Sequence, residues 1–157
     1  MMHDLKIRPA SAADSIPWTL LLSADAQRRE VQKYLERGEL WLAELGGRVV
    51  GEMVLLETRA DIWEVMNIAV SPRHRRKGIG FALLKRARAI AKRRGAHRLE
   101  VGTDPGGFGR LAFYQRFGFR IVSVDLDFFV RRYRRPVRSN GILVRDMLRM
   151  VIEFPRA

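Results

Sequence analysis

The sequence has 157 residues, of which 47% are hydrophobic and 30% are charged, with no cysteine and a formal net charge of +13. This length suits one domain with a full core, and we expect residues 1–157 to form a single domain. The lack of cysteine excludes disulfides, cysteine-ligated metals and a cysteine nucleophile.

The sequence also bears on where the protein works and what it binds. No apolar run approaches the roughly 20 residues that cross a bilayer, and the N-terminus MMHDLKIRP lacks the apolar segment of a secretory signal. We therefore predict a cytoplasmic protein without membrane contact. The positive charge would attract a nucleic acid, an acidic partner or a phosphorylated cofactor. The alternative is that arginine is simply the solubilising residue favoured by the organism.

The first half of the chain predicts a strand, two helices and three further strands. A serine followed three residues later by an acid, Ser11 and Asp14, is typical of a helix start. Gly46-Gly47 between two apolar runs predicts a two-residue hairpin turn. The expected segments are a strand over 4–8, helices over 11–22 and 24–37, and strands over 39–45, 48–57 and 62–70.

The most informative stretch runs from Asn67 to Gly95 and reads NIAVSPRHRRKGIGFALLKRARAIAKRRG. A strand ending in Ile-Ala-Val leads into a basic run and then into a predicted helix over 79–95. The helix ends at Gly95, a residue that favours the left-handed C-cap conformation. Its apolar face comprises Ile79, Ala82, Leu83, Ala87, Ile90 and Ala91.

This strand–loop–helix arrangement predicts an anion site. A helix N-terminus carries unsatisfied backbone N–H groups and about half a positive charge. Gly78 and Gly80 lack the Cβ atoms that would keep a phosphate from the backbone, and cations from 73 to 77 precede them. No Gly-Lys-Ser or Gly-Lys-Thr is present, which excludes a Walker loop. A dinucleotide fingerprint would need a third glycine where Leu83 stands.

The remaining chain predicts alternating strands and helices. With the first half, the order becomes β-α-α-β-β-β-α-β-α-β-β, which predicts a mixed, mostly antiparallel α/β sheet. One right-handed parallel crossover should join the strand over 62–70 to the strand over 98–102. The other expected segments are a helix over 108–117, a strand over 120–129, a basic connection over 131–141 and a last strand over 142–154.

Two motifs carry a resemblance to a known family. The run Arg75-x-x-Gly78-x-Gly80 is similar to the coenzyme A loop of the GNAT acyltransferase superfamily. The stretch Leu111–Phe119, LAFYQRFGF, resembles the tyrosine-bearing helix and strand start of the same enzymes, and the element order is theirs as well. The resemblance covers residues 1–130 and is tightest from 62 to 120. The C-terminal part looks like that of a small bacterial subgroup.

The resemblance implies the GNAT fold, with a sheet that splays around acetyl-CoA. It also implies an N-acetyltransferase that moves the acetyl group directly from the thioester to a primary amine. Acetyl-CoA would be the co-substrate, without a metal. The implied acetyl-CoA-binding residues are Ile68, Ala69, Val70, Arg75, Arg76, Lys77, Gly78, Ile79, Gly80 and Thr103. Thr103 is included because the family often has an asparagine, at the position of Gly107, that contacts the pantetheine arm. Gly107 has no side chain for this contact, which Thr103 would then make.

The resemblance also implies catalytic residues. Tyr114 matches the family tyrosine that protonates the leaving thiolate. Glu64 lies six residues before Val70, where many members carry a glutamate base, and it is the first candidate for that role. Glu100 is the rival, and a chain of water molecules serves in several relatives. The acceptor is a small molecule, a protein N-terminus or a lysine, and a homodimer is left open.

A second hypothesis is a basic module that keeps the fold without catalysis and binds nucleic acid or an acidic partner. It would use the run from Arg131 to Arg138, RRYRRPVR, in which a tyrosine lies among arginines. The alternative for that run is a solvated loop.

Overall fold

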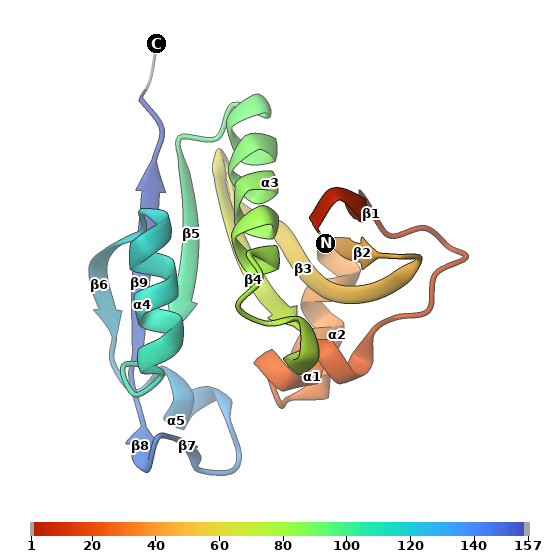
Figure 1. The fold of residues 1–157 in the computed structure, drawn as a ribbon. Coiled ribbons are helices and arrows are strands. Elements are labelled where there is room, and N and C mark those ends of the chain that lie inside the picture. The colour runs from red at the N-terminus through yellow and green to blue at the C-terminus, as the bar shows by residue number, and fades with distance from the viewer. Residues whose placement is uncertain (1, 156–157) are drawn as a thin grey trace. The chain divides into compact units, whose positions relative to one another are not determined.

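The computed structural model describes residues 2–155, which divide into two compact units, one up to Ala96 and one from His97 onward. Figure 1 shows the helices and strands of each unit. A single domain over residues 1–157 stays a prediction.

The described residues of the first unit form four strands, three α-helices and two short 3-10 turns. In chain order the elements are η1 (Met2–Asp4), β1 (Leu5–Pro9), α1 (Trp18–Ala24), α2 (Arg28–Arg37), β2 (Glu39–Leu45), β3 (Arg48–Arg59), β4 (Ile62–Val70), η2 (Pro72–His74) and α3 (Ile79–Arg93).

The strands of this unit pair in the order β1-β2-β3-β4, and every pairing is antiparallel. The predicted hairpin between β2 and β3 is confirmed, because Gly46 and Gly47 have φ angles of 56° and 79°. The pairing of β3 with β4 shifts register between Val54 and Leu55, so that Val54 lies opposite Asn67 and Leu55 opposite Val65. This bulge bends β4 just before its Ile-Ala-Val end.

Helices cover both faces of this four-stranded sheet. On one face, a Cβ at Gly51 would meet Ile79 at 3.5 Å, which places the start of α3 against β3. On the other face, Val54 and Leu56 form a buried cluster with side chains from α1 and α2. Because alternate residues of a strand point to opposite faces, neighbours along β3 face different helices. We call the second side the α1/α2 face.

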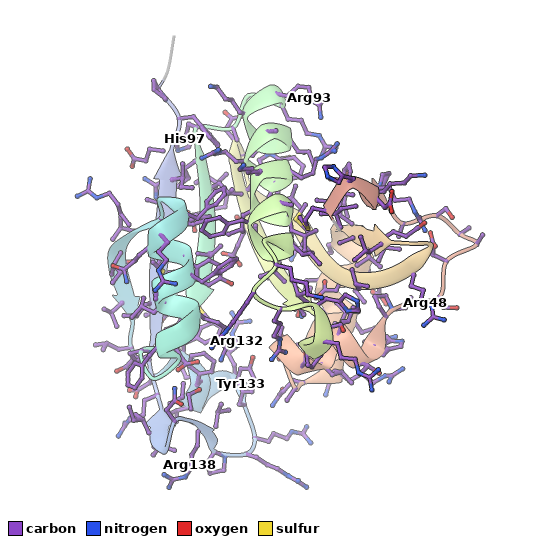
Figure 2. All side chains as sticks on the ribbon, viewed as in Figure 1. Arg48, Arg93, His97, Arg132, Tyr133 and Arg138 are labelled. Atoms are coloured by element: carbon purple, nitrogen blue, oxygen red, sulfur yellow. The ribbon has the colours of Figure 1, made fainter. Side chains whose placement is uncertain are left out.

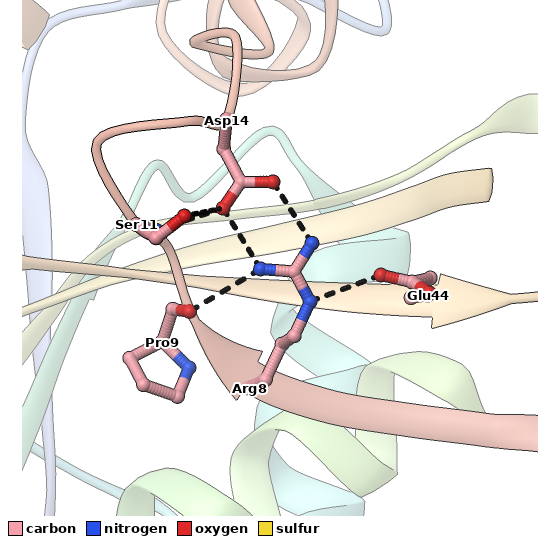
Figure 3. Close-up of polar contacts among 5 residues, drawn as sticks. All are labelled: Arg8, Pro9, Ser11, Asp14 and Glu44. Carbon is pink, nitrogen blue, oxygen red and sulfur yellow. Dashed lines mark hydrogen bonds and ion pairs between the residues drawn. The ribbon is translucent and has the colours of Figure 1, made fainter. Parts of the chain in front are cut away.

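The expected helix start at Ser11 is wrong, because α1 begins only at Trp18. The Asp14 carboxylate accepts hydrogen bonds from the Ser11 N–H at 2.7 Å and from Arg8, whose Nη1 and Nη2 both lie at 2.8 Å (Figure 3). The Arg8 guanidinium also holds the pKa of Asp14 below its usual range. Arg8 further contacts Glu44 at 2.9 Å, so the turn is fastened to β1 and β2.

Helix α3 begins at Ile79 as predicted and ends at Arg93, two residues before the predicted end. Its buried residues are Ile79, Leu83, Leu84, Ala87, Ile90 and Ala91, so Leu84 is buried and the predicted Ala82 is only partly covered. At the C-terminus, Gly95 has a φ of 79°, and the Ala96 N–H donates to the Ala91 carbonyl at 3.0 Å. This hydrogen bond is typical of a left-handed helix stop.

The second unit is built on three strands in the order β5-β9-β6, all antiparallel. Separately, β7 and β8 form a two-stranded hairpin. In chain order the elements are β5 (Arg98–Thr103), α4 (Phe108–Phe117), β6 (Arg120–Asp125), α5 (Phe128–Arg132), β7 (Val137–Ser139), β8 (Ile142–Val144) and β9 (Met147–Glu153).

Two sequence expectations for this unit are wrong in detail. The strand expected over 120–129 ends at Asp125, because Asp127 takes a left-handed φ of 59° and α5 begins at Phe128. The strand expected over 142–154 is divided into β8 and β9. The residues between them are used in contacts: the Arg145 carbonyl accepts from the Phe129 N–H at 3.0 Å, and Asp146 accepts from the Asp127 N–H at 2.8 Å.

Within residues 2–155, no helix is long and apolar enough to span a membrane.

Candidate active site

The loop between β4 and α3 is fastened to the ends of the strands that precede it. The Ser71 N–H donates to the Val50 carbonyl at 2.8 Å, and the His74 N–H donates to the Ser71 carbonyl at 2.9 Å. The Arg75 side chain turns back and donates from Nε to the Val70 carbonyl at 3.0 Å. The basic loop therefore has a defined path at the end of β4.

Two residues of this loop adopt left-handed backbone conformations. Arg76 has a φ of 60° and Gly78 has a φ of 84°, with Lys77 between them. Alternation of this kind directs successive backbone N–H groups toward one side and forms an anion-binding concavity. A positive φ costs a non-glycine residue about 1–2 kcal/mol, so the conformation of Arg76 is imposed by its surroundings.

Helix α3 begins directly after this concavity. Gly78 is its N-cap, and the Ala82 N–H donates the first helical hydrogen bond, to the Gly78 carbonyl at 3.0 Å. Helix geometry directs the amides of Ile79 and Gly80 along the axis, out of the helix end. A Cβ at Gly78 would meet no atom closer than the Met2 methyl carbon at 3.9 Å, so the backbone there is open to a ligand.

The cations of the loop complete the anion site. Arg73, Arg75, Arg76 and Lys77 are all exposed, and the helix N-terminus adds its partial positive charge. Guanidinium groups and backbone amides are the donors that bind phosphate oxygens best. This half of the site fits a diphosphate.

The end of β4 lies beside the loop. Ile68, Ala69 and Val70 pair with β3 opposite Met53, Glu52 and Gly51, respectively. Since opposed residues of an antiparallel pair point to the same side, Val70 faces α3 with Gly51, and Ala69 faces the α1/α2 side. The backbone of β4 thus presents N–H and C=O groups along the edge turned away from β3.

The two glutamates named as base candidates are both buried, one in each unit. Glu64, 8% exposed, lies on β4 opposite Leu56 and therefore on the α1/α2 face. Glu100, 7% exposed, lies on β5 opposite Val151. The Glu100 carboxylate is 3.7 Å from Nη1 of Arg98.

A third buried carboxylate, Glu52, was missed by the sequence reasoning. It lies on β3, its exposed fraction is 0%, and among the described residues neither of its oxygens has a hydrogen-bond partner. Burial raises the pKa of Glu52 from 4.5 to about 8. The available signal was its position in the run VVGEMVLL, which is too apolar for a strand with one wet face.

Glu52 lies in a polar cluster on the α1/α2 face. Asn67 donates from Nδ2 to the Leu21 carbonyl at 3.0 Å and to the Tyr34 hydroxyl at 2.9 Å. The Tyr34 hydroxyl donates to Asp25 at 3.2 Å. The pKa of Tyr34 is raised, mainly by burial, and the negative charge of Glu52 contributes to that rise.

In the second unit, Tyr114 is held in the α4 helix and is 6% exposed. Its ring meets that of Phe119 edge-on, with centroids 5.8 Å apart, and lies 5.3 Å from that of Phe113. The Phe119 N–H donates to the Tyr114 carbonyl at 3.0 Å, which closes the helix at Gly118. The ring therefore has a fixed place in the unit.

The turn before α4 explains the glycine at its N-cap. A Cβ at Gly107 would lie 3.2 Å from Asp104 Oδ2, a tight contact. The buried Asp104 carboxylate also accepts hydrogen bonds from Arg110 and Ser139, each at 3.2 Å. Thr103 is buried at the end of β5, immediately before this turn.

The predicted site residues therefore fall into two groups. In the first unit, the structure brings together the end of β4, the basic loop and the start of α3, with Glu64 further back along β4. In the second unit, Glu100 and Thr103 share β5, and Tyr114 lies on the following helix. Among the described residues there is no cluster of three or more His, Asp or Glu side chains that could hold a metal.

The arginine-rich run from 131 to 138 spans the end of α5, a turn and the start of β7 (Figure 2). Arg131 pairs with Asp125 at 2.7 Å, and Arg132 lies over the ring of Phe128, 5.2 Å from its centroid. The Tyr133 ring packs against Phe129, with centroids 5.3 Å apart. These contacts engage the tyrosine and two of the arginines within the unit.

Comparison with known proteins identifies relatives over nearly the whole chain. The chain is 40% identical to an uncharacterized N-acetyltransferase of Bacillus subtilis, YvbK, over 98% of this chain and 99% of the relative. A GNAT family acetyltransferase from Elizabethkingia anophelis, solved with acetyl-CoA bound, has a TM-score of 0.93 at 36% identity, covering 97% and 99% of the two chains. An IAA acetyltransferase from Bacillus cereus has a TM-score of 0.89 at 43% identity, covering 96% and 99%.

These structures confirm the predicted fold, a mixed and mostly antiparallel α/β arrangement of the GNAT type. The sequence profile described as "Acetyltransferase (GNAT) family" matches residues 7–119, which include the basic loop, the start of α3 and Tyr114. The chain belongs to the GNAT acetyltransferase family.

Proposed function

We propose that the protein is an N-acetyltransferase that moves an acetyl group directly from acetyl-CoA to a primary amine. The observation that carries this proposal is the loop over residues 71–78 with the α3 N-terminus. Two left-handed residues, an open N-cap at Gly78 and four exposed cations there suit the pyrophosphate of the co-substrate.

In this proposal the diphosphate is held by the backbone amides from Gly78 to Gly80 and by Arg75, Arg76 and Lys77. The pantetheine arm adds to β4 as an extra strand would, along the backbone of residues 68–70. An amide of the same strand donates to the thioester carbonyl and stabilises the oxyanion that develops there. Thr103 lies at the end of β5 and contributes a hydroxyl to the pantetheine arm.

The reaction needs two proton transfers. An alkylamine has a pKa near 10 and must lose a proton before its lone pair can attack the thioester carbon. Glu64 and Glu100 remain the two base candidates from the sequence. The tetrahedral intermediate then expels the thiolate of coenzyme A, and Tyr114 donates the proton that neutralises it. The products are an N-acetylated amine and free coenzyme A.

The test is release of the coenzyme A thiol from acetyl-CoA in the presence of primary amines: a diamine, an aminoglycoside, an amino acid amide and a peptide with a free N-terminus. We expect at least one amine to accelerate thiol release, with a product heavier by one acetyl group in mass spectrometry. If acetyl-CoA binds and no amine accelerates its turnover above background hydrolysis, the proposed function is wrong.

A further inference from the structure

The α1/α2 face carries two buried hydrogen-bond acceptors that the reaction described above does not use. Glu52 lies opposite Ala69, and Asn67 lies opposite Val54, two positions along the same strand pair. Diagonal neighbours of this kind on one face are about 7–8 Å apart at the backbone, within reach of long side chains. Glu52 and Asn67 therefore belong to one site.

The orientation of the Asn67 amide is fixed by its donors. Both protons of Nδ2 are used, one by the Leu21 carbonyl and the other by the Tyr34 hydroxyl. The opposite atom, Oδ1, is buried and has no hydrogen-bond partner among the described residues. Neither carboxylate oxygen of Glu52 has one either. An unmet buried acceptor destabilises a fold, and a charged acceptor does so more strongly.

The titratable neighbours on this face make the site suitable for a cation. They are Tyr34 from α2, Asp25 from the turn after α1, and Glu64 from β4. The first is neutral at ordinary pH and the other two are acids. A ligand that satisfies this face must bring N–H donors, and a positive charge would strengthen every bond.

The position of the site relative to β4 links it to the acetyl donor. The pyrophosphate site lies at the start of α3, on the opposite face of the same strands. Glu52 is directly across from Ala69, the central residue of the segment proposed to pair with pantetheine. Pantetheine added to the far edge of β4 would lie two strand spacings, about 10 Å, from the backbone of β3. An amine on the α1/α2 face would lie between the thioester and the Glu52 side chain.

We propose that Glu52 and Asn67 bind the ammonium group of the acceptor, and that Glu52, in place of Glu64 or Glu100, accepts the proton that this group must lose. This inference rests on the proposed function and narrows its substrate class to alkylamines that are cationic at neutral pH. Asn67 Oδ1 accepts one N–H bond and holds the nitrogen while its proton leaves.

The proton transfer balances within this site. Above its pKa of about 8, Glu52 is ionised, and the ammonium R–NH3⁺ and the Glu52 carboxylate then give R–NH2 and a neutral Glu52 carboxylic acid. The amine lone pair then forms the C–N bond as the C–S bond breaks, the thiolate takes its proton from Tyr114, and Glu52 returns its own proton to water. A base works best when its affinity for protons matches the working pH, as burial provides here.

The acceptor reaches Glu52 through the helical cover of the α1/α2 face. Helix α1 is the shorter of the two covering helices, with seven residues against ten in α2, and neither helix has a capping side chain among the described residues. Short uncapped helices lie at the low-stability end of a fold and open locally. Opening of α1 would expose Leu21, whose carbonyl holds Asn67.

The test compares Glu52→Gln with Glu57→Gln, an exposed glutamate on the same strand, and with Glu64→Gln and Glu100→Gln. The acceptor is the best alkylamine of the panel, used beside its β-fluorinated analogue, whose ammonium loses its proton more easily. We expect Glu52→Gln to lower kcat/KM for the alkylamine about 100-fold at pH 8, near the pKa of Glu52, which is the lower end of general-base effects. The loss should shrink with the fluorinated amine and as the pH rises, while acetyl-CoA still raises the Tm. The other three variants should lose less than tenfold.

Three outcomes would overturn the inference. An equal loss of kcat/KM for both amines at every pH would indicate damage to the fold. An unchanged kcat/KM in Glu52→Gln would show that this carboxylate takes no part in the reaction. A pH-dependent loss at Glu64 or Glu100 instead would move the base there. If wild-type protein binds acetyl-CoA and turns over no amine at all, the proposed function fails as well, which distinguishes the two failures.

Discussion

Glu52 of β3 lies directly opposite Ala69 of β4, so a fully buried carboxylate adjoins the strand end that leads into the basic loop. A buried carboxylate without a hydrogen-bond partner destabilises a core, and such groups are typical of functional sites. This pair of residues therefore links the stability of the fold to its chemistry, and both consequences can be measured.

The first prediction concerns stability as a function of pH. The pKa of Glu52 is 4.5 in the ordinary state and about 8 in the folded protein, so between these values the folded state holds a proton that the unfolded state has lost. The contribution of the neutral Glu52 carboxyl to the free energy of unfolding is fully present below pH 4.5 and is lost as the pH rises through its folded-state pKa of about 8. Relative to wild type, Glu52→Gln should therefore gain stability with rising pH, by up to about 5 kcal/mol.

Urea unfolding of wild type, Glu52→Gln and Glu57→Gln at acidic and alkaline pH checks this prediction. The Glu57 variant should follow the wild-type pH dependence, because Glu57 is exposed on the same strand. Parallel curves for wild type and Glu52→Gln would show that Glu52 is ionised in the folded protein at neutral pH.

The second prediction concerns the acid. Tyr114→Phe removes one hydroxyl and keeps the ring packed against Phe119. We expect kcat to fall about 100-fold with little change in the KM for acetyl-CoA, because the proton is needed only as the thiolate leaves. Steady-state kinetics with Tyr133→Phe as the matched control measures the effect. A raised KM with an unchanged kcat would make the hydroxyl a binding group.

Much of the fold follows from local patterns. The strand over 62–70 and the helix over 108–117 have the predicted bounds, since their apolar periods and flanking glycines are local features. The hairpin at Gly46-Gly47 is equally local, because only its own backbone decides the turn type. The basic loop could be identified for the same reason: its glycines and cations are contiguous.

The wrong predictions, and the failure to identify Glu52, are explained by contacts between residues far apart in the sequence. Asp14 looks like part of a helix start, but Arg8, from the preceding strand, takes its carboxylate into an ion pair. The strand expected over 120–129 ends early, as β6, because the N–H of Asp127 donates to the side chain of Asp146, 19 residues later, and not to a neighbouring strand. Glu52 was overlooked since its meaning depends on α1 and α2 covering that face of β3. None of these partners can be read from neighbouring residues.

The most direct test of the account is acetyl-CoA binding by wild type, Gly78→Asp and Gly95→Asp, measured by calorimetry and by the shift in Tm. The two glycines lie at opposite ends of α3 with similar φ angles of 84° and 79°, and aspartate tolerates that conformation. For a ligand at 100 times its Kd, the expected stabilisation is about 2.7 kcal/mol. We predict that wild type and Gly95→Asp keep this stabilisation and that Gly78→Asp loses it. Undiminished binding by a folded Gly78→Asp variant would contradict the pyrophosphate site on which the proposed function rests.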